Sequence, residues 1–261
     1  MTEIDSINIQ SKEERDTLLK EAEVTRERGE LEAALNMFLK IKEWDEQNDV
    51  NNPKRSAVYG HMRITYSRMA LHEPELPNKK EFLSLASQCS QEGLAFMEAF
   101  PDEKGLLATM QIHAASSANE LAEVVEGEER TLELNKALMR IEEAIKNLPG
   151  SEAHKAWPLR TKTEILRKLQ RFPEATQCAL NGIELIFKGY LDELEKDAEA
   201  AELKLLVWIT GLHLELARIA RDENKMLLAR YFAGLVVNTT DTSGTLTERK
   251  KEAQELLDSL S

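Results

Sequence analysis

Helix breakers recur along this chain at a regular interval, and that regularity limits the fold more than any other feature. Pro53, Pro101 and Pro149 each follow a run of helical periodicity, and they stand 48 residues apart. Further turn signals, among them Gly29 and Gly127, fall between them. A fixed period of this kind is typical of repeat architectures, in which each unit is one supersecondary element. Here each unit reads as two helices joined by a turn.

Apolar residues recur at helical spacing almost throughout, and no window alternates apolar and polar residues as a strand would. Segment 31–44 shows the pattern, with Leu31, Ala34, Leu35, Phe38 and Ile41 on one side and Glu32, Asn36, Lys40 and Glu43 on the other. We therefore expect an all-α chain with five helix pairs, over 13–47, 54–99, 103–148, 152–188 and 199–238. A last helix over about 246–259 should cap the apolar end of the stack. Residues 1–12 are expected to be disordered, and 13–261 to form a single domain.

Composition narrows the class of protein. The chain has 47 acidic and 34 basic residues and a net charge of −13, which disfavours nucleic acid and anionic membranes as partners. It holds no apolar run of eighteen residues, so we expect no membrane span. Cys89 and Cys178 lie in helical patterns among apolar neighbours and are expected to be buried free thiols. The first residues lack a secretory pattern, and a cytoplasmic protein is the expectation.

Three segments resemble the tetratricopeptide repeat. The matching positions are Leu18, Ala22, Gly29, Ala34, Phe38 and Ile41 in the first; Leu134, Ala137, Ile141, Ala144, Ile145 and Pro149 in the second; and Leu159, Thr163, Leu166, Phe172, Ala175, Ala179 and Gly182 in the third. The resemblance implies a right-handed α-solenoid of about five helix pairs. Its alternative is a stack of helix pairs of another class, since the family period is about 34 residues.

Patterns that carry catalysis or hold cofactors do not stand out. No two histidines are spaced for a helical metal site, and phosphate-binding loops and a nucleophile elbow are missing from the sequence. We therefore expect a non-catalytic protein without a cofactor, and an enzyme of unrecognised type remains an alternative.

One segment is basic in this acidic chain. Residues 151–171 hold six basic and two acidic residues. In the resembled family the first helix of each unit lines the concave groove, which would place Trp157, Arg160, Glu164, Arg167 and Lys168 there. Arginine grips a carboxylate through two parallel hydrogen bonds, so this face suits an acidic peptide. The alternative, and the commoner situation for charged helices, is a solvated face balanced by the acidic runs at 120–133 and 192–202.

The second helix pair adds Arg63 to the groove candidates, with other basic residues on the same helix. Where the family's clamp for acidic C-terminal tails has Lys and Asn, this chain has Leu19 and Glu23, which argues against that role. We therefore expect a protein-interaction module that holds a peptide or a partner's helix in its groove. The rival hypothesis is a structural or regulatory subunit that self-associates through its terminal repeats.

Overall fold

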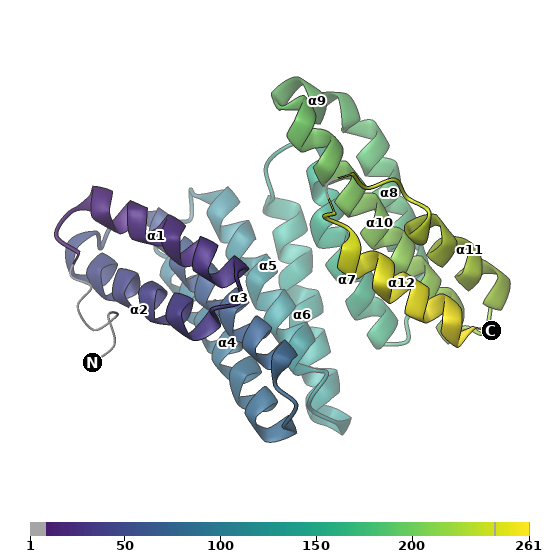
Figure 1. Cartoon of the computed structure of the whole chain (residues 1–261), viewed down its shortest axis with the longest axis horizontal. Coiled ribbons are helices and arrows are strands. Elements are labelled where there is room, and N and C mark those ends of the chain that lie inside the picture. The colour runs from purple at the N-terminus through teal and green to yellow at the C-terminus, as the bar shows by residue number, and fades with distance from the viewer. Residues whose placement is uncertain (1–8, 243, 261) are drawn as a thin grey trace. The chain divides into compact units, whose positions relative to one another are not determined.

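The chain is all-helical, as expected. The computed structural model describes residues 9–242 and 244–260, and over these residues it contains twelve α-helices and no strand, with 82% of these residues in α- or 3-10 helix. Within each of two compact units, consecutive helices pack against each other (Figure 1). Among the described residues, no helix is both long enough and apolar enough to span a membrane.

The helices fall into two compact units, which meet in sequence at Asn147 and Leu148. The first unit contains α1 (Lys12–Glu27), α2 (Leu31–Asn48), α3 (Ser56–His72), α4 (Leu76–Met97), α5 (Lys104–Leu121) and α6 (Gly127–Asn147). These form the three expected helix pairs, and a 3-10 turn at Pro53–Arg55 leads into α3. Each pair packs closely, and the pairs are joined by contacts of α2 with α3 and of α4 with α5.

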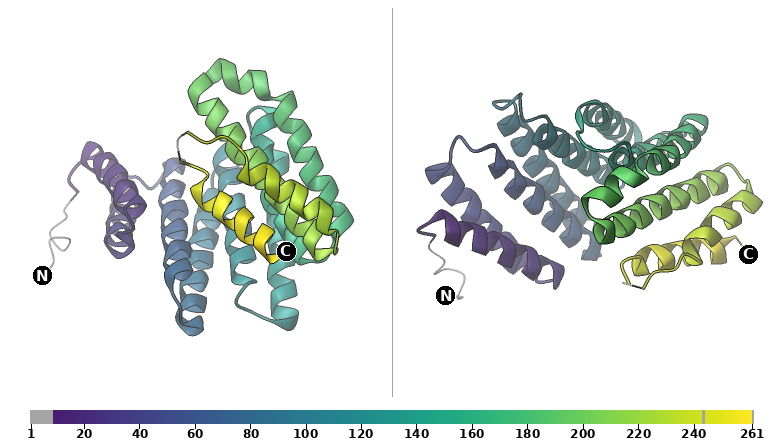
Figure 2. Two further views of the ribbon diagram at one scale, coloured as in Figure 1. Left: turned by 45° about the vertical axis from the view of Figure 1, so that its right-hand side comes forward. Right: turned by 90° about the horizontal axis from the view of Figure 1, so that it is seen from above.

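The second unit contains the two remaining pairs and the last helix. A 3-10 turn at Glu152–Lys155 leads into α7 (Ala156–Lys168), which is followed by α8 (Phe172–Lys188), α9 (Tyr190–Lys196), α10 (Ala198–Asp222), α11 (Met226–Val237) and α12 (Thr247–Ser259). The sequence did not lead us to expect the short helix α9. Helix α10 is central, because it packs against α7, α8, α9, α11 and α12. Figure 2 shows the helices of each unit from two further directions.

Three of the hairpins close with the same backbone turn. The second residue after the first helix of each hairpin has a positive φ, +85° at Gly29, 60° at Gln170 and 59° at Asn224. Its N–H donates to the carbonyl three residues back, and the next N–H donates to the carbonyl five residues back. This is the Schellman arrangement, which satisfies carbonyls at the end of a helix. Glycine and asparagine tolerate that backbone region, so two of the three turns have a local sequence cause.

Small residues let the two helices of each pair approach. In the first pair Ala22, Ala34, Phe38 and Ile41 have no exposed surface. Most other positions of the tetratricopeptide-like pattern are buried as well: Leu18, Leu134, Ala137, Ile141, Ala144, Leu159, Thr163, Leu166, Ala175, Ala179 and Gly182. Ile145 and Phe172 are only partly buried, and Gly29 and Pro149 are exposed. Side chains of graded size fill the space between helices, which is how close packing is reached without voids. The helix faces predicted from the sequence are therefore the packed faces.

The last helix covers apolar surface, as expected. Ala253, Leu256 and Leu260 are buried and form a core cluster with residues of α10 and α11, such as Leu214 and Val236. Because α12 closes this cluster, its removal would expose apolar side chains to water.

The N-terminal segment is described only from residue 9 onward. Residues 1–8 of the segment expected to be disordered lie outside the described residues. Helix α1 begins at Lys12, where the Ser11 side chain accepts a hydrogen bond from the Glu14 N–H. The single domain over 13–261 stays a prediction beside the two compact units. Cys89 and Cys178 are buried and form no disulfide, as predicted.

Candidate functional site

The predicted basic face lies on α7 and meets α10. Both helices belong to the second unit. The residues of α7 that contact α10 follow one another in the same order as their partners along α10. Trp157 is close to Trp208 through the ring of His154, and Arg160 lies against Gly211. Further along, Arg167 reaches Glu215. The two helices therefore run parallel.

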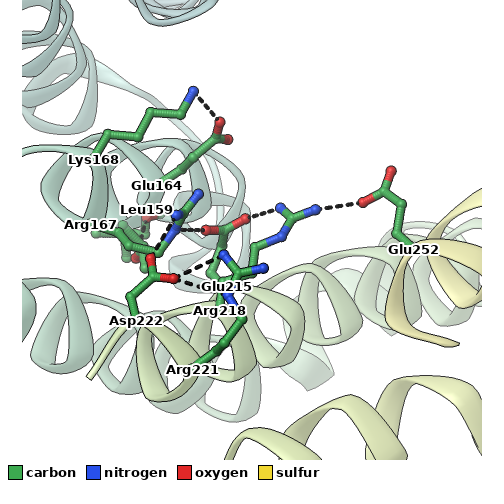
Figure 3. A network of polar contacts seen from close by, with 10 residues as sticks. Leu159, Glu164, Arg167, Lys168, Glu215, Arg218, Arg221, Asp222 and Glu252 are labelled. Carbon is green, nitrogen blue, oxygen red and sulfur yellow. Dashed lines mark hydrogen bonds and ion pairs between the residues drawn. The ribbon is translucent and has the colours of Figure 1, made fainter. Parts of the chain in front are cut away.

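Arg167 is held inside the protein by carboxylates that the sequence analysis had not assigned to it. Its Nε donates to Glu215 Oε2 at 3.2 Å, and its Nη1 donates to Asp222 Oδ2 at 3.0 Å (Figure 3). Only 15% of the Arg167 side chain is exposed, and none of Glu215 is. The charge of Arg167 is therefore neutralised by carboxylates of the protein itself. Arg167 therefore fixes α7 against α10.

Glu215 is shared with a second arginine. Arg218 Nη1 donates to Glu215 Oε1 at 2.6 Å, and its Nη2 donates to Glu252 Oε2 on α12 at 2.7 Å. Burial alone would lower the pKa of Arg218, but the Glu215 carboxylate raises that pKa above the usual arginine value. The network thus links three helices, as Figure 3 shows.

Lys168 and Glu164 also pair with each other. Lys168 Nζ lies 2.8 Å from Glu164 Oε1, one helical turn away, and both side chains are largely buried. Three of the predicted groove residues on α7 therefore have their charges balanced within the protein.

Arg160 differs from its neighbours on α7. Its side chain crosses α10 at Gly211, where a Cβ atom would lie 2.9 Å from the Arg160 Cδ. Its Nε is buried without a hydrogen-bond partner. A buried donor without an acceptor is unfavourable, and native proteins rarely keep one without a reason.

Arg249 of α12 reaches the same part of α10. Its Nη1 donates to Thr210 Oγ1 at 2.9 Å and also to the Val207 carbonyl. Burial lowers its pKa to about 10, the positive charges of Arg160 and Arg218 add to that effect, and the carboxylates of Glu252 and Glu215 oppose it. Among the side chains that the structure describes, no carboxylate forms an ion pair with Arg160 or Arg249. Sequence reasoning missed Arg249, because nothing local distinguishes it from the lysines that follow it.

An aromatic cluster adjoins this arginine pair. The His154 ring stacks on Trp157, with centroids 6.2 Å apart, and on Trp208, with centroids 5.9 Å apart. Trp208 is only partly buried. The face therefore offers flat apolar surface one helical turn from two guanidinium groups.

Arg63, the remaining predicted site residue, belongs to the first unit. It is buried on α3, and its Nε donates to Ser117 Oγ on α5 at 3.2 Å. Its Nη2 donates to Glu120, which also accepts a 2.6 Å hydrogen bond from Ser67. Arg63 therefore joins α3 to α5 through a compensated charge.

Comparisons with known proteins leave the family open. The sequence matches no family model, and no curated protein matches it. The tetratricopeptide resemblance therefore stays a prediction.

Proposed function

We propose that this chain is a non-catalytic protein-interaction module of the cytoplasm, built as a tetratricopeptide-like right-handed solenoid. It holds an acidic peptide or partner helix on the face formed by the first helices of its hairpins. The repeated hairpin turn and the buried small residues support the solenoid. The two cysteines form no disulfide, which fits a reducing compartment.

One observation carries the binding proposal: Arg160 and Arg249 converge on α10, and neither forms an ion pair with a described carboxylate, while Glu252 and Glu215 act on Arg249 without pairing with it. Elsewhere on this face the basic side chains are compensated from within. An acidic group of a partner would supply the missing negative charge, and the nearby tryptophans would cover its apolar neighbours.

Arg167 is unsuitable for a binding test, because its charge is needed within the fold. Reversing the charge of Arg167 would break its pairs with Glu215 and Asp222 and destabilise the fold. We therefore choose Arg160→Gln with Arg249→Gln, matched by Lys155→Gln with Lys251→Gln, which makes the same change in net charge.

The test is binding to an array of synthetic peptides that vary in their number of acidic residues. We expect the wild type and the lysine control to retain acidic peptides, more weakly as salt rises, and the arginine variant to lose them. Equal retention by all three proteins would move the binding surface elsewhere. No retention of acidic peptides by the wild type would refute the proposal.

Self-association is the second candidate function, and exposed apolar residues on α11 favour it. Leu227 is 83% exposed and Tyr231 is 60% exposed, and they lie one turn apart on the same side of the helix. Such residues on a terminal hairpin suit an interface between copies. Light scattering of Leu227→Lys with Tyr231→Lys tests this function, with Leu71→Lys in the first unit as control. A dimer that only the α11 variant abolishes would support it, and a monomeric wild type would exclude it.

A further inference from the structure

The ion pairs of this face leave out two of its arginines. Arg167, Lys168, Arg218 and Arg221 each pair with one or more of four carboxylates, namely Glu164, Glu215, Asp222 and Glu252. Among the described side chains, no carboxylate forms an ion pair with Arg160 or Arg249, although Glu252 and Glu215 lie near enough to act on the Arg249 pKa. Two positive side chains therefore lie outside the ion pairs, in a chain whose net charge is −13.

The fold brings these two charges together at a cost. Arg160 comes from α7 and Arg249 from α12, and they meet over residues 207–211 of α10. Like charges that are partly withdrawn from water disfavour the charged state, and the lowered pKa of Arg249 is consistent with this.

Gly211 makes the arrangement possible. The Arg160 side chain occupies the space that a Cβ at this position would fill. A glycine inside a long helix lowers helix stability relative to alanine. Glycine at this position lowers the stability of α10, but it leaves room for the Arg160 side chain next to Arg249.

Two guanidinium groups match an anion with two charges better than one with a single charge. A phosphate monoester carries about −1.5 to −2 at pH 7 and presents three strong acceptor oxygens. One carboxylate would leave one arginine uncompensated. Arginine also offers paired donors that fit phosphate oxygens.

From these contacts we infer that Arg160 and Arg249 form a binding site for a phosphate-monoester dianion over Gly211. The inference rests on the proposed function where the phosphate belongs to a partner peptide, and it specifies the acidic group that this peptide carries. The same chemistry could come from a free phosphorylated compound, so the experiment separates the two sources.

The experiment is isothermal titration of the full-length protein with three probes. These are inorganic phosphate, a pentapeptide with a central phosphoserine, and the same pentapeptide with glutamate at that position. We expect phosphate and the phosphopeptide to bind. The affinity for the glutamate peptide should be lower by at least about tenfold, as the loss of a charge-assisted hydrogen bond implies.

The variants locate the site. Arg160→Gln and Arg249→Gln should each weaken phosphate binding by about tenfold or more, whereas Lys155→Gln and Lys251→Gln should change it less than about twofold. Gly211→Ala keeps both charges and displaces Arg160, so we expect it to weaken binding as well. If Arg249→Gln does not fold, Arg249→Lys keeps the charge but loses the planar donor pair, and it should bind phosphate more weakly than wild type.

The possible results separate the two proposals. Equal affinity for the glutamate and phosphoserine peptides overturns the dianion site and leaves the acidic-peptide function standing. Binding of inorganic phosphate without either peptide supports the dianion site and counts against the peptide function. The dianion site is refuted if phosphate does not bind, or if its binding is unchanged in both arginine variants.

Discussion

Replacing Glu215 with glutamine removes the carboxylate that Arg167 and Arg218 share and leaves the side-chain shape unchanged. The carboxylate is fully buried, with Arg218 Nη1 at 2.6 Å and Arg167 Nε at 3.2 Å. Removing one partner of a buried ion pair commonly costs about 3–5 kcal/mol. Because Arg167 keeps Asp222 and Arg218 keeps Glu252, we place the loss in unfolding free energy near the lower end, at about 3 kcal/mol.

Thermal unfolding followed by circular dichroism measures this loss. For a unit of this size a destabilisation of about 3 kcal/mol corresponds to a fall in Tm of roughly 10 °C. Glu248→Gln is the matched control, since it makes the same charge change at an exposed site on α12 and should cost less than about 0.5 kcal/mol.

A double-mutant cycle tests the cause. If Glu215 acts through Arg167, then Arg167→Gln should cost much less in the Glu215→Gln background than in the wild type. A Glu215→Gln variant that unfolds at the same temperature as Glu248→Gln would show that the network does not stabilise the second unit.

Three further predictions concern packing, pH and thiol reactivity. Ala34→Trp should disrupt the first helix pair, because Ala34 has no exposed surface and overpacking there costs about 1–3 kcal/mol or more; an unchanged Tm would contradict this. Burial and nearby positive charges lower the pKa of His113 to about 3, so the folded state resists protonation and stability should fall as pH drops from about 6.5 towards 3. His113→Gln should fall less steeply than wild type over that range, and the exposed His72→Gln should follow the wild type. Finally, Cys89 and Cys178 should resist a thiol reagent at pH 8 until the protein unfolds, since both are buried and burial raises the pKa of Cys89 to about 11; rapid labelling of the native protein would refute this.

The helices and their packed faces could be predicted from the sequence to within a few residues. Helical periodicity and breakers act over one or two turns of chain, so they can be read locally. The Gly29 turn and the apolar side of the last helix are examples. Helix α9 was missed because its short acidic sequence has no clear periodicity of its own.

The candidate site could be predicted only in part. The helical spacing placed Arg160, Glu164, Arg167 and Lys168 on one face, and the structure keeps them there. It could not show that Glu215 neutralises Arg167, because that contact joins residues far apart in the chain.

Only the tertiary structure decided which of the basic side chains are paired with carboxylates. By spacing alone Arg160 and Arg167 are equivalent, yet Arg167 is paired and the Arg160 Nε has no partner. The difference arises because α10 presents Glu215 to one and Gly211 to the other, and α12 adds Arg249 beside Arg160. Local periodicity decides which side of a helix is polar, whereas the energy of each charge depends on the groups that packing brings within a few ångströms.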